Sequence, residues 1–244
     1  VEDDTMYLFY TGNVRHLGDY DYINEGRGSN TALGISRDGI HLDAKAVLME
    51  NKDYPPDISN HVRDPKVWKQ DGKYYMTLGA RTREGCGEVL IYQSDDLRRW
   101  EHINVIATPE PFGYMWECPD LFQVDGQWIL AVSPQGIKPY GHIGQNVYSC
   151  GYFPFYGDFR GEYTLGEYRE LDCGFDYYAQ QSFAAPDGRR IALGWMGMPD
   201  ADYTNPTAAF GWQHCLSVPR ELHWTNGGLT VWPVRELEQL RQNT

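Results

Sequence analysis

Two short motifs each place charged or polar side chains just before a proline, and together they could perform acid–base chemistry. Arg63 and Asp64 stand before one proline, and Glu117 and Cys118 stand before another. Hydrolysis of a glycosidic bond uses such a pair of carboxylic acids, because one protonates the leaving oxygen while another acts on the opposite face of the sugar. Each motif alone has a simpler explanation, since an Arg-Asp pair can form an ion pair at the start of a strand and a lone Glu can be a residue at the edge of the fold.

The two motifs occupy the same place in an internal repeat. Arg63 lies eight residues before the Asp-Gly pair at 71–72, and Glu117 lies eight residues before the Asp-Gly pair at 125–126. Asp-Gly between two short apolar strands is a strong signal for a β-hairpin, because both turn positions accept positive φ. Each motif is therefore expected on the first strand of a hairpin.

Further copies of the repeat predict the architecture. One contains the turn at 187–188, and another, with only its turn and second strand, begins at Asp3 and Asp4. Successive turn aspartates are 67, 54 and 62 residues apart, which suits four-stranded propeller blades with long loops. We predict an all-β chain that forms a single β-propeller domain over 1–244, with about four blade units. A helical segment is expected only at 234–241.

Blade geometry brings the two motifs together. The first strand of each propeller blade lines the central channel, so equivalent positions of successive repeats converge. Arg63 is equivalent to Glu117 in this register, and Asp64 is equivalent to Cys118. We therefore expect the carboxyl groups of Asp64 and Glu117 to meet in one funnel.

Composition narrows the class of partner. The 21 basic and 34 acidic side chains give a net charge of −13, which disfavours nucleic acid and anionic membranes as partners. The 18 tyrosines and 8 tryptophans suit strands and could also stack on sugars. Five widely spaced cysteines without a metal-ligand pattern predict a reduced, cytoplasmic protein with no bound metal. No apolar run reaches the ~18 residues of a membrane span.

The motifs resemble those of glycoside hydrolase family 32, which contains invertases, bacterial sucrose-6-phosphate hydrolases and fructanases. The resemblance covers nearly the whole chain. The segments that carry it, in the family's order, are YLFYTGN (7–13), HVRDPKVW (61–68), MWECPDL (115–121), DYYAQQSF (176–183), GWMG (194–197) and PREL (219–222). It implies a β-propeller of the five-bladed type, with the first blade missing here, that cleaves β-fructofuranosyl linkages by a retaining mechanism without a cofactor.

The resemblance also implies roles for the residues of the two motifs. Glu117 would be the general acid and then the general base. Asp64 would hold two hydroxyls of the fructosyl ring and stabilise the transition state, with Arg63 orienting those contacts. Cys118 would modulate Glu117 as a neighbour, although a small buried hydrophobe is an equally good interpretation.

Three residues outside these motifs are also candidates for substrate binding. Tyr178 is expected to border the fructosyl site. Arg81 and Trp195 are weaker candidates for the leaving-group side, and structural roles are favoured for both.

The sequence departs from the family at the nucleophile. The family's Asn-Asp-Pro-Asn-Gly motif is absent, and the usual β-sandwich does not follow the propeller. Asp3 and Asp4 are near the right place, but the repeat register puts them on an outward turn. A retaining glycosidase needs two carboxyl groups ~5 to 5.5 Å apart, so we expect this chain alone to be inactive.

Several alternatives stay open. A non-catalytic protein could retain the sugar pocket and only bind, and a fructosyltransferase would pass the fructosyl group to a sugar instead of water. Sucrose, sucrose 6-phosphate, inulin and levan are not distinguished as substrates. A propeller that lacks one blade exposes strand edges and apolar blade faces, so we also expect self-association.

Overall fold

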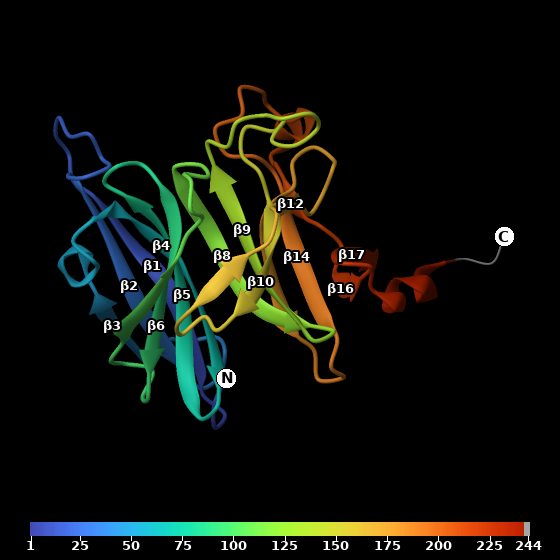
Figure 1. Ribbon diagram of the computed structural model, residues 1–244. Coiled ribbons are helices and arrows are strands. Elements are labelled where there is room, and N and C mark those ends of the chain that lie inside the picture. The colour runs from blue at the N-terminus through green and yellow to red at the C-terminus, as the bar shows by residue number, and fades with distance from the viewer. Residues whose placement is uncertain (242–244) are drawn as a thin grey trace. The chain divides into compact units, whose positions relative to one another are not determined.

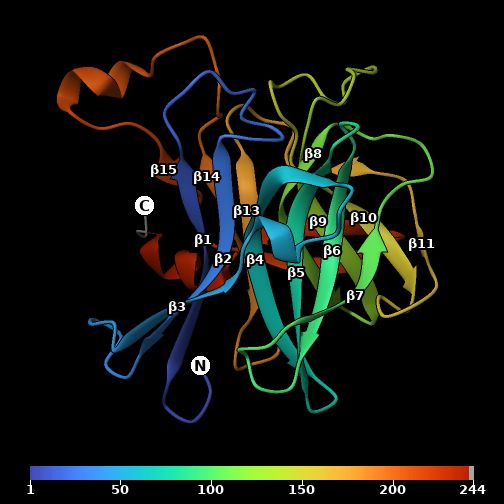
Figure 2. The same cartoon turned by 90° about the vertical axis from the view of Figure 1, so that its left-hand side faces the viewer.

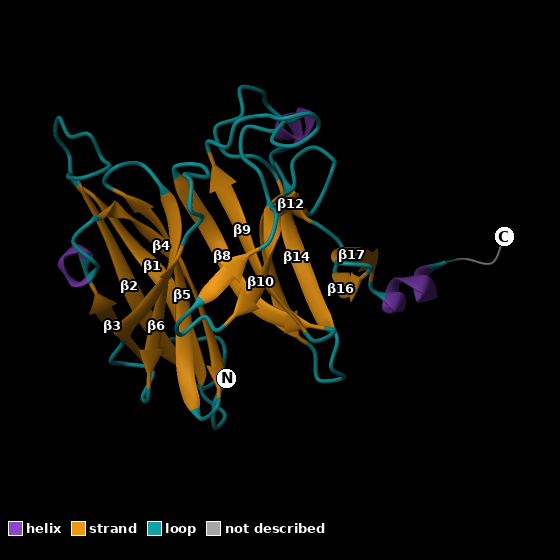
Figure 3. Cartoon of the chain, viewed as in Figure 1, coloured by secondary structure: helices purple, strands orange, loops and turns teal. Residues whose placement is uncertain are grey.

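The structure, a computed structural model, describes residues 1–241. Within that range it contains β-strands and three short 3₁₀ helices, in agreement with the predicted all-β class (Figure 3). The helices are η1 (Asn51–Asp53), η2 (Pro206–Phe210) and η3 (Arg235–Leu240). The last of them falls in the segment predicted to be helical. No helix in the described range is long and apolar enough to cross a membrane.

The strands form four sheets in sequence order (Figure 1). The first has the order β1-β2-β3, with strands β1 (Met6–Arg15), β2 (Arg27–Ser36) and β3 (Ala44–Met49). The second has the order β4-β5-β6-β7, with strands β4 (Ile58–Gln70), β5 (Lys73–Thr82), β6 (Gly87–Ser94) and β7 (Glu101–Ile106), and Figure 2 shows these four side by side.

The other two sheets have the same meander with one small strand added to each. The third has the order β11-β10-β9-β8, with strands β8 (Met115–Val124), β9 (Gln127–Gln135), β10 (Gly151–Gly157) and β11 (Tyr163–Leu165), and β12 (Arg169–Glu170) pairs with β10. The fourth has the order β13-β14-β16-β17, with strands β13 (Tyr178–Ala184), β14 (Arg190–Met196), β16 (Arg220–Thr225) and β17 (Gly228–Pro233), and β15 (Cys215–Leu216) pairs with β14.

The predicted hairpin turns are present, and two of the Asp-Gly pairs have the expected backbone. Asp71-Gly72 and Asp125-Gly126 have positive φ at both positions, as a two-residue hairpin turn requires. Asp3-Asp4 also has positive φ at both positions, and Glu2 bridges to Thr5 across it. The turn at 187–188 differs, because only its glycine has positive φ. It is wider, and the backbone N–H of Ala185 donates to the carbonyl of Arg189 across it.

The chain divides into two compact units. The first comprises residues 1–119, 134–136 and 157–163, and the second comprises the other described residues. In the first unit Tyr75–Ala80 of β5 and Gly87–Tyr92 of β6 are buried without interruption. These strands are covered on both faces, which explains why their apolar runs do not alternate.

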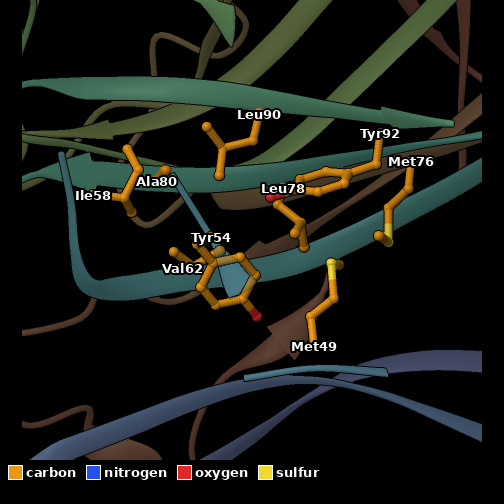
Figure 4. Packing of buried hydrophobic residues seen from close by; sticks show 9 residues of the cluster. All are labelled: Met49, Tyr54, Ile58, Val62, Met76, Leu78, Ala80, Leu90 and Tyr92. Atoms are coloured by element: carbon orange, nitrogen blue, oxygen red, sulfur yellow. The ribbon is translucent and has the colours of Figure 1, made fainter. Parts of the chain in front are cut away.

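Each unit has its own apolar core. The core of the first unit is formed by nine buried residues of the first two sheets and the segment between them (Figure 4): Met49, Tyr54, Ile58, Val62, Met76, Leu78, Ala80, Leu90 and Tyr92. A cluster in the second unit combines the third and fourth sheets: Phe122, Val124, Ile129, Ala131, Tyr152, Ala192 and Leu222.

Candidate active site

The two sequence motifs coincide with a left-handed residue in each of two strands. Asp64 of β4 has φ 61°, and Cys118 of β8 has φ 50°. The pairing of β4 with β5 shifts register at this point, as at a β-bulge. A bulge turns side chains away from their regular alternation, and such features cluster next to active sites. Ala179 of β13 has the same backbone, φ 53°, and the pairing of β13 with β14 also shifts register.

Arg63 and Glu117 form the central ion pair of the site. Nε and Nη2 of Arg63 each lie 2.7 Å from Oε1 of Glu117. The two side chains are only 16% and 15% exposed, so water screens the pair weakly. The equivalent positions of these two neighbouring repeats are thus in direct contact.

The other oxygen of Glu117 is also held. Nε2 of Gln135, at the end of β9, donates to Oε2 of Glu117 across 2.8 Å. The preceding residue, Trp116, is fully buried, and its ring N–H donates to the carbonyl of Phe112 across 2.6 Å. A side chain at Gly87 would come within 2.4 Å of the Trp116 ring, so glycine is required there. Glu117 is thus fixed both through its carboxyl group and through the backbone that carries it.

Asp64 accepts hydrogen bonds from the neighbouring motif. Its Oδ2 accepts the backbone N–H of Cys118 at 2.9 Å, and the Cys118 thiol lies 3.6 Å from the same oxygen. The backbone N–H of Asp64 donates to Oγ1 of Thr11 on β1. Burial raises the pKa of Asp64, the N–H of Cys118 opposes that shift, and the charge of Glu117 raises the pKa further.

One predicted contact differs in detail. Cys118 was expected to act on Glu117, and the structure places its N–H and thiol on Asp64. The guanidinium of Arg63 donates to Glu117 and to His61. Its predicted role in orienting the contacts of Asp64 with the fructosyl ring stays a prediction.

The remaining candidates lie in two groups. In the first unit Arg81 stacks on the ring of Tyr114, with its guanidinium carbon 4.8 Å from the ring centroid. In the second unit Tyr178 of β13 lies opposite Trp195 of β14 in the strand register. Tyr178 is buried and donates to the carbonyl of Ser133 across 3.2 Å. The predicted roles of these three residues in substrate binding stay predictions.

Sequence reasoning missed two residues that contact the ion pair. Gln135 follows a proline at the end of an apolar strand, and His61 precedes Arg63 by two residues. The only signal for His61 was that residues two apart on a strand share a face. Among residues 1–241 no group of three or more His, Cys, Asp or Glu side chains could hold a metal ion. All five cysteines are free thiols in the structure.

Known proteins match the chain along its length. The model of the glycosyl hydrolases family 32 N-terminal domain matches residues 1–233. The sucrose-6-phosphate hydrolase of Bacillus subtilis is 41% identical over 250 residues, which covers 100% of this chain and 50% of that protein. The chain thus spans about half the length of the curated relatives that it matches.

Solved structures also match the whole chain. A β-fructofuranosidase of Bombyx mori has a TM-score of 0.88 and 33% identity, over 100% of this chain and 51% of its own. A variant of that enzyme is solved in complex with sucrose. The sucrose-6-phosphate hydrolase of Lactobacillus gasseri has a TM-score of 0.87 and 33% identity, over 100% and 49% of the two chains. These matches confirm the predicted β-propeller class.

Proposed function

The chain belongs to glycosyl hydrolase family 32, and from that membership we propose that it carries the acid–base part of a β-fructofuranosidase. Such an enzyme cleaves β-fructofuranosyl linkages, as in sucrose. The observation that carries the proposal is the carboxyl group of Glu117. It is held by Arg63 on one oxygen and by Gln135 on the other, beside the buried carboxyl group of Asp64.

In this proposal the two oxygens of Glu117 have different tasks. Oε1 accepts two N–H groups of Arg63, so both of its lone pairs are engaged. We therefore place the catalytic proton on Oε2, the oxygen that also accepts an N–H of Gln135. In the first step Glu117 gives this proton to the glycosidic oxygen as the bond to the fructosyl carbon breaks. In the second it takes a proton from water.

Asp64 acts on the sugar and not on the leaving group. Its Oδ2 is fixed by the N–H of Cys118, which leaves Oδ1 to accept hydroxyl groups of the fructosyl ring. Positive charge develops on that ring in the transition state, and a nearby carboxylate stabilises it. Burial strengthens this interaction, because the local dielectric is low.

The nucleophile is the part of the mechanism that this chain does not supply in our proposal. Asp3 and Asp4 lie exposed on a hairpin turn with φ 47° and 57°, so they do not take that role. We infer that residues 1–244 alone do not turn over substrate. The substrate is a small sugar with a terminal fructosyl group, with sucrose and sucrose 6-phosphate preferred from the names of the relatives.

One assay tests the proposal. Hydrolysis of sucrose and sucrose 6-phosphate is measured with residues 1–244 and with the complete reading frame that contains them. We expect activity only from the complete protein, with loss of activity in its Glu117→Gln variant. An inactive complete protein that still binds sucrose would replace the proposal with a sugar-binding function. Formation of fructosylated sucrose as the main product would replace hydrolysis with transfer.

A further inference from the structure

A chain of hydrogen bonds leads from Glu117 to a surface loop. Arg63 uses Nε and Nη2 on Glu117 and donates through Nη1 to Nδ1 of His61 at 2.9 Å. Nε2 of His61 in turn lies 2.9 Å from the backbone carbonyl of Tyr22, in the loop between β1 and β2. All of these residues belong to the first unit.

The two partners of His61 define its chemical form. A guanidinium can only donate, and a carbonyl oxygen can only accept. Nδ1 must therefore carry the lone pair and Nε2 the proton, which is one tautomer of the neutral ring. A second guanidinium is near the ring, because Nη1 of Arg27 lies 3.5 and 3.3 Å from Nδ1 and Nε2 of His61. Burial first, and then the charges of Arg63 and Arg27, lower the pKa of His61 to about 4.

Hydrogen bonds within the loop hold Tyr22 in place. Tyr22 has φ 55°, a left-handed conformation that turns its carbonyl away from the course of the loop. The Asp21 carboxylate accepts the backbone N–H groups of Ile23 and Asn24 at 2.9 Å each. The Tyr22 hydroxyl lies 3.0 Å from two carbonyls earlier in the loop. These bonds hold the loop in one conformation, so the carbonyl is a fixed point for His61.

His61 limits the orientations that the Arg63 guanidinium can adopt. Arg63 contacts a single oxygen of Glu117, and such a contact does not fix the plane of the guanidinium. The bond from Nη1 to His61 provides the third point that does. We propose that His61 positions Arg63 against Glu117 and thereby couples the 16–26 loop to that carboxyl group. The positioning rests on the acid–base role proposed for Glu117.

Two conservative variants separate positioning from simple packing. His61→Asn keeps an acceptor at the place of Nδ1, and His61→Gln keeps a donor at the place of Nε2. In the complete protein, we expect His61→Gln and His61→Ala to lower kcat about 10- to 100-fold with little change in KM, as misplacement of a catalytic group does. His61→Asn should recover most of that loss. Equal loss in His61→Asn and His61→Gln, or a change in KM alone, would overturn the inference.

A second measurement does not depend on activity. The Arg63 Nε–H resonance of residues 1–244 is followed by nuclear magnetic resonance as a probe of the pair with Glu117. We expect a slowly exchanging signal in the wild type and in His61→Asn, and rapid exchange in His61→Gln and His61→Ala. An unchanged signal in His61→Ala would overturn the positioning. An inactive wild-type protein with the expected exchange pattern would instead reject the proposed function and leave the positioning in place.

Discussion

The backbone N–H of Cys118 donates to Oδ2 of Asp64 across 2.9 Å, so the two left-handed residues of β4 and β8 are hydrogen-bonded to each other. Each bulge would by itself cost conformational energy, and the bond between them offsets part of that cost. Because of this bond, the position of Asp64 depends more on the backbone of Cys118 than on the Cys118 thiol. The carboxyl groups of Asp64 and Glu117 are neighbours because two bulged strands are joined at this point.

Replacement of the Cys118 thiol should therefore have a small effect. In Cys118→Ala the backbone N–H remains, and the weak S–H contact at 3.6 Å is lost. We expect kcat/KM of the complete protein to fall about 2- to 5-fold, which corresponds to the ~0.5 to 1 kcal/mol of one weak hydrogen bond. Steady-state kinetics on sucrose measure it, with Cys118→Ser as the control that retains a donor. A loss of 100-fold or more in Cys118→Ala would mean that the thiol acts on Glu117 directly.

Glu117→Gln should remove activity and leave the fold intact. The amide keeps an oxygen for Arg63, and Gln135 can rotate its own amide to accept from the new NH₂ group, so the contacts with Arg63 and Gln135 both have replacements. We expect kcat of the complete protein to fall about 10²- to 10⁴-fold, as loss of a general acid–base group does. The unfolding temperature and the affinity for sucrose serve as controls, and both should stay near wild type. Wild-type kcat in this variant would exclude the assigned role.

The position of the site could be predicted from local chemistry, whereas its hydrogen bonds could not. Asp-Gly pairs mark hairpins because both turn positions accept positive φ, and the equal spacing of Arg63 and Glu117 from these pairs aligns the two residues. The contact of Cys118 with Asp64 depends on a bulge, which shifts the alternation of side chains and has no signal in a pattern of period two. Gln135 and His61 were missed because their partners are set by side-chain geometry, which leaves no spacing signal in the sequence.

Asp120 should contribute mainly to stability. It is 1% exposed, its Oδ2 accepts the backbone N–H and hydroxyl of Ser182, and Arg190 lies 3.3 Å from its Oδ1. Asp120→Ala leaves the largely buried Arg190 without this partner and Ser182 without its acceptor. We expect the free energy of unfolding to fall by about 3 to 5 kcal/mol, measured by urea denaturation of residues 1–244. Asp120→Asn keeps the acceptor for Ser182 and should cost less, and equal losses would contradict this explanation.

Self-association should involve the first sheet. Its edge strand β1 exposes Leu8, Tyr10 and Val14, which are 42%, 40% and 42% exposed. These residues share one face of β1, because they are separated by even numbers of positions. We expect residues 1–244 to form oligomers in sedimentation experiments at high concentration, and Leu8→Lys with Val14→Lys should shift the population toward monomer. A concentrated wild-type sample that remains monomeric would contradict the prediction.

Glu88 should make stability depend on pH. It is 7% exposed in β6, and its Oε1 has no hydrogen-bond partner among the described residues. Burial first, and the charge of Asp57 second, raise the pKa of Glu88 from 4.5 to about 7. The folded state therefore holds the proton more tightly than the unfolded state does. This stabilisation is fully present below pH 4.5 and is lost as the pH rises to about 7.

The variant Glu88→Gln isolates this contribution, because glutamine resembles the protonated acid at every pH. His61 has the opposite sign, since its lowered pKa removes stability as the pH falls from 6.5 to about 4, so the wild-type curve alone mixes the two effects. We expect Glu88→Gln to equal the wild type near pH 4.5 and to exceed its free energy of unfolding by about 3 kcal/mol at pH 8, from 1.36 kcal/mol per pKa unit. Chemical denaturation of residues 1–244 at both pH values measures the difference. A difference that does not change with pH would show that the Glu88 carboxyl group is ionised in the folded protein at low cost.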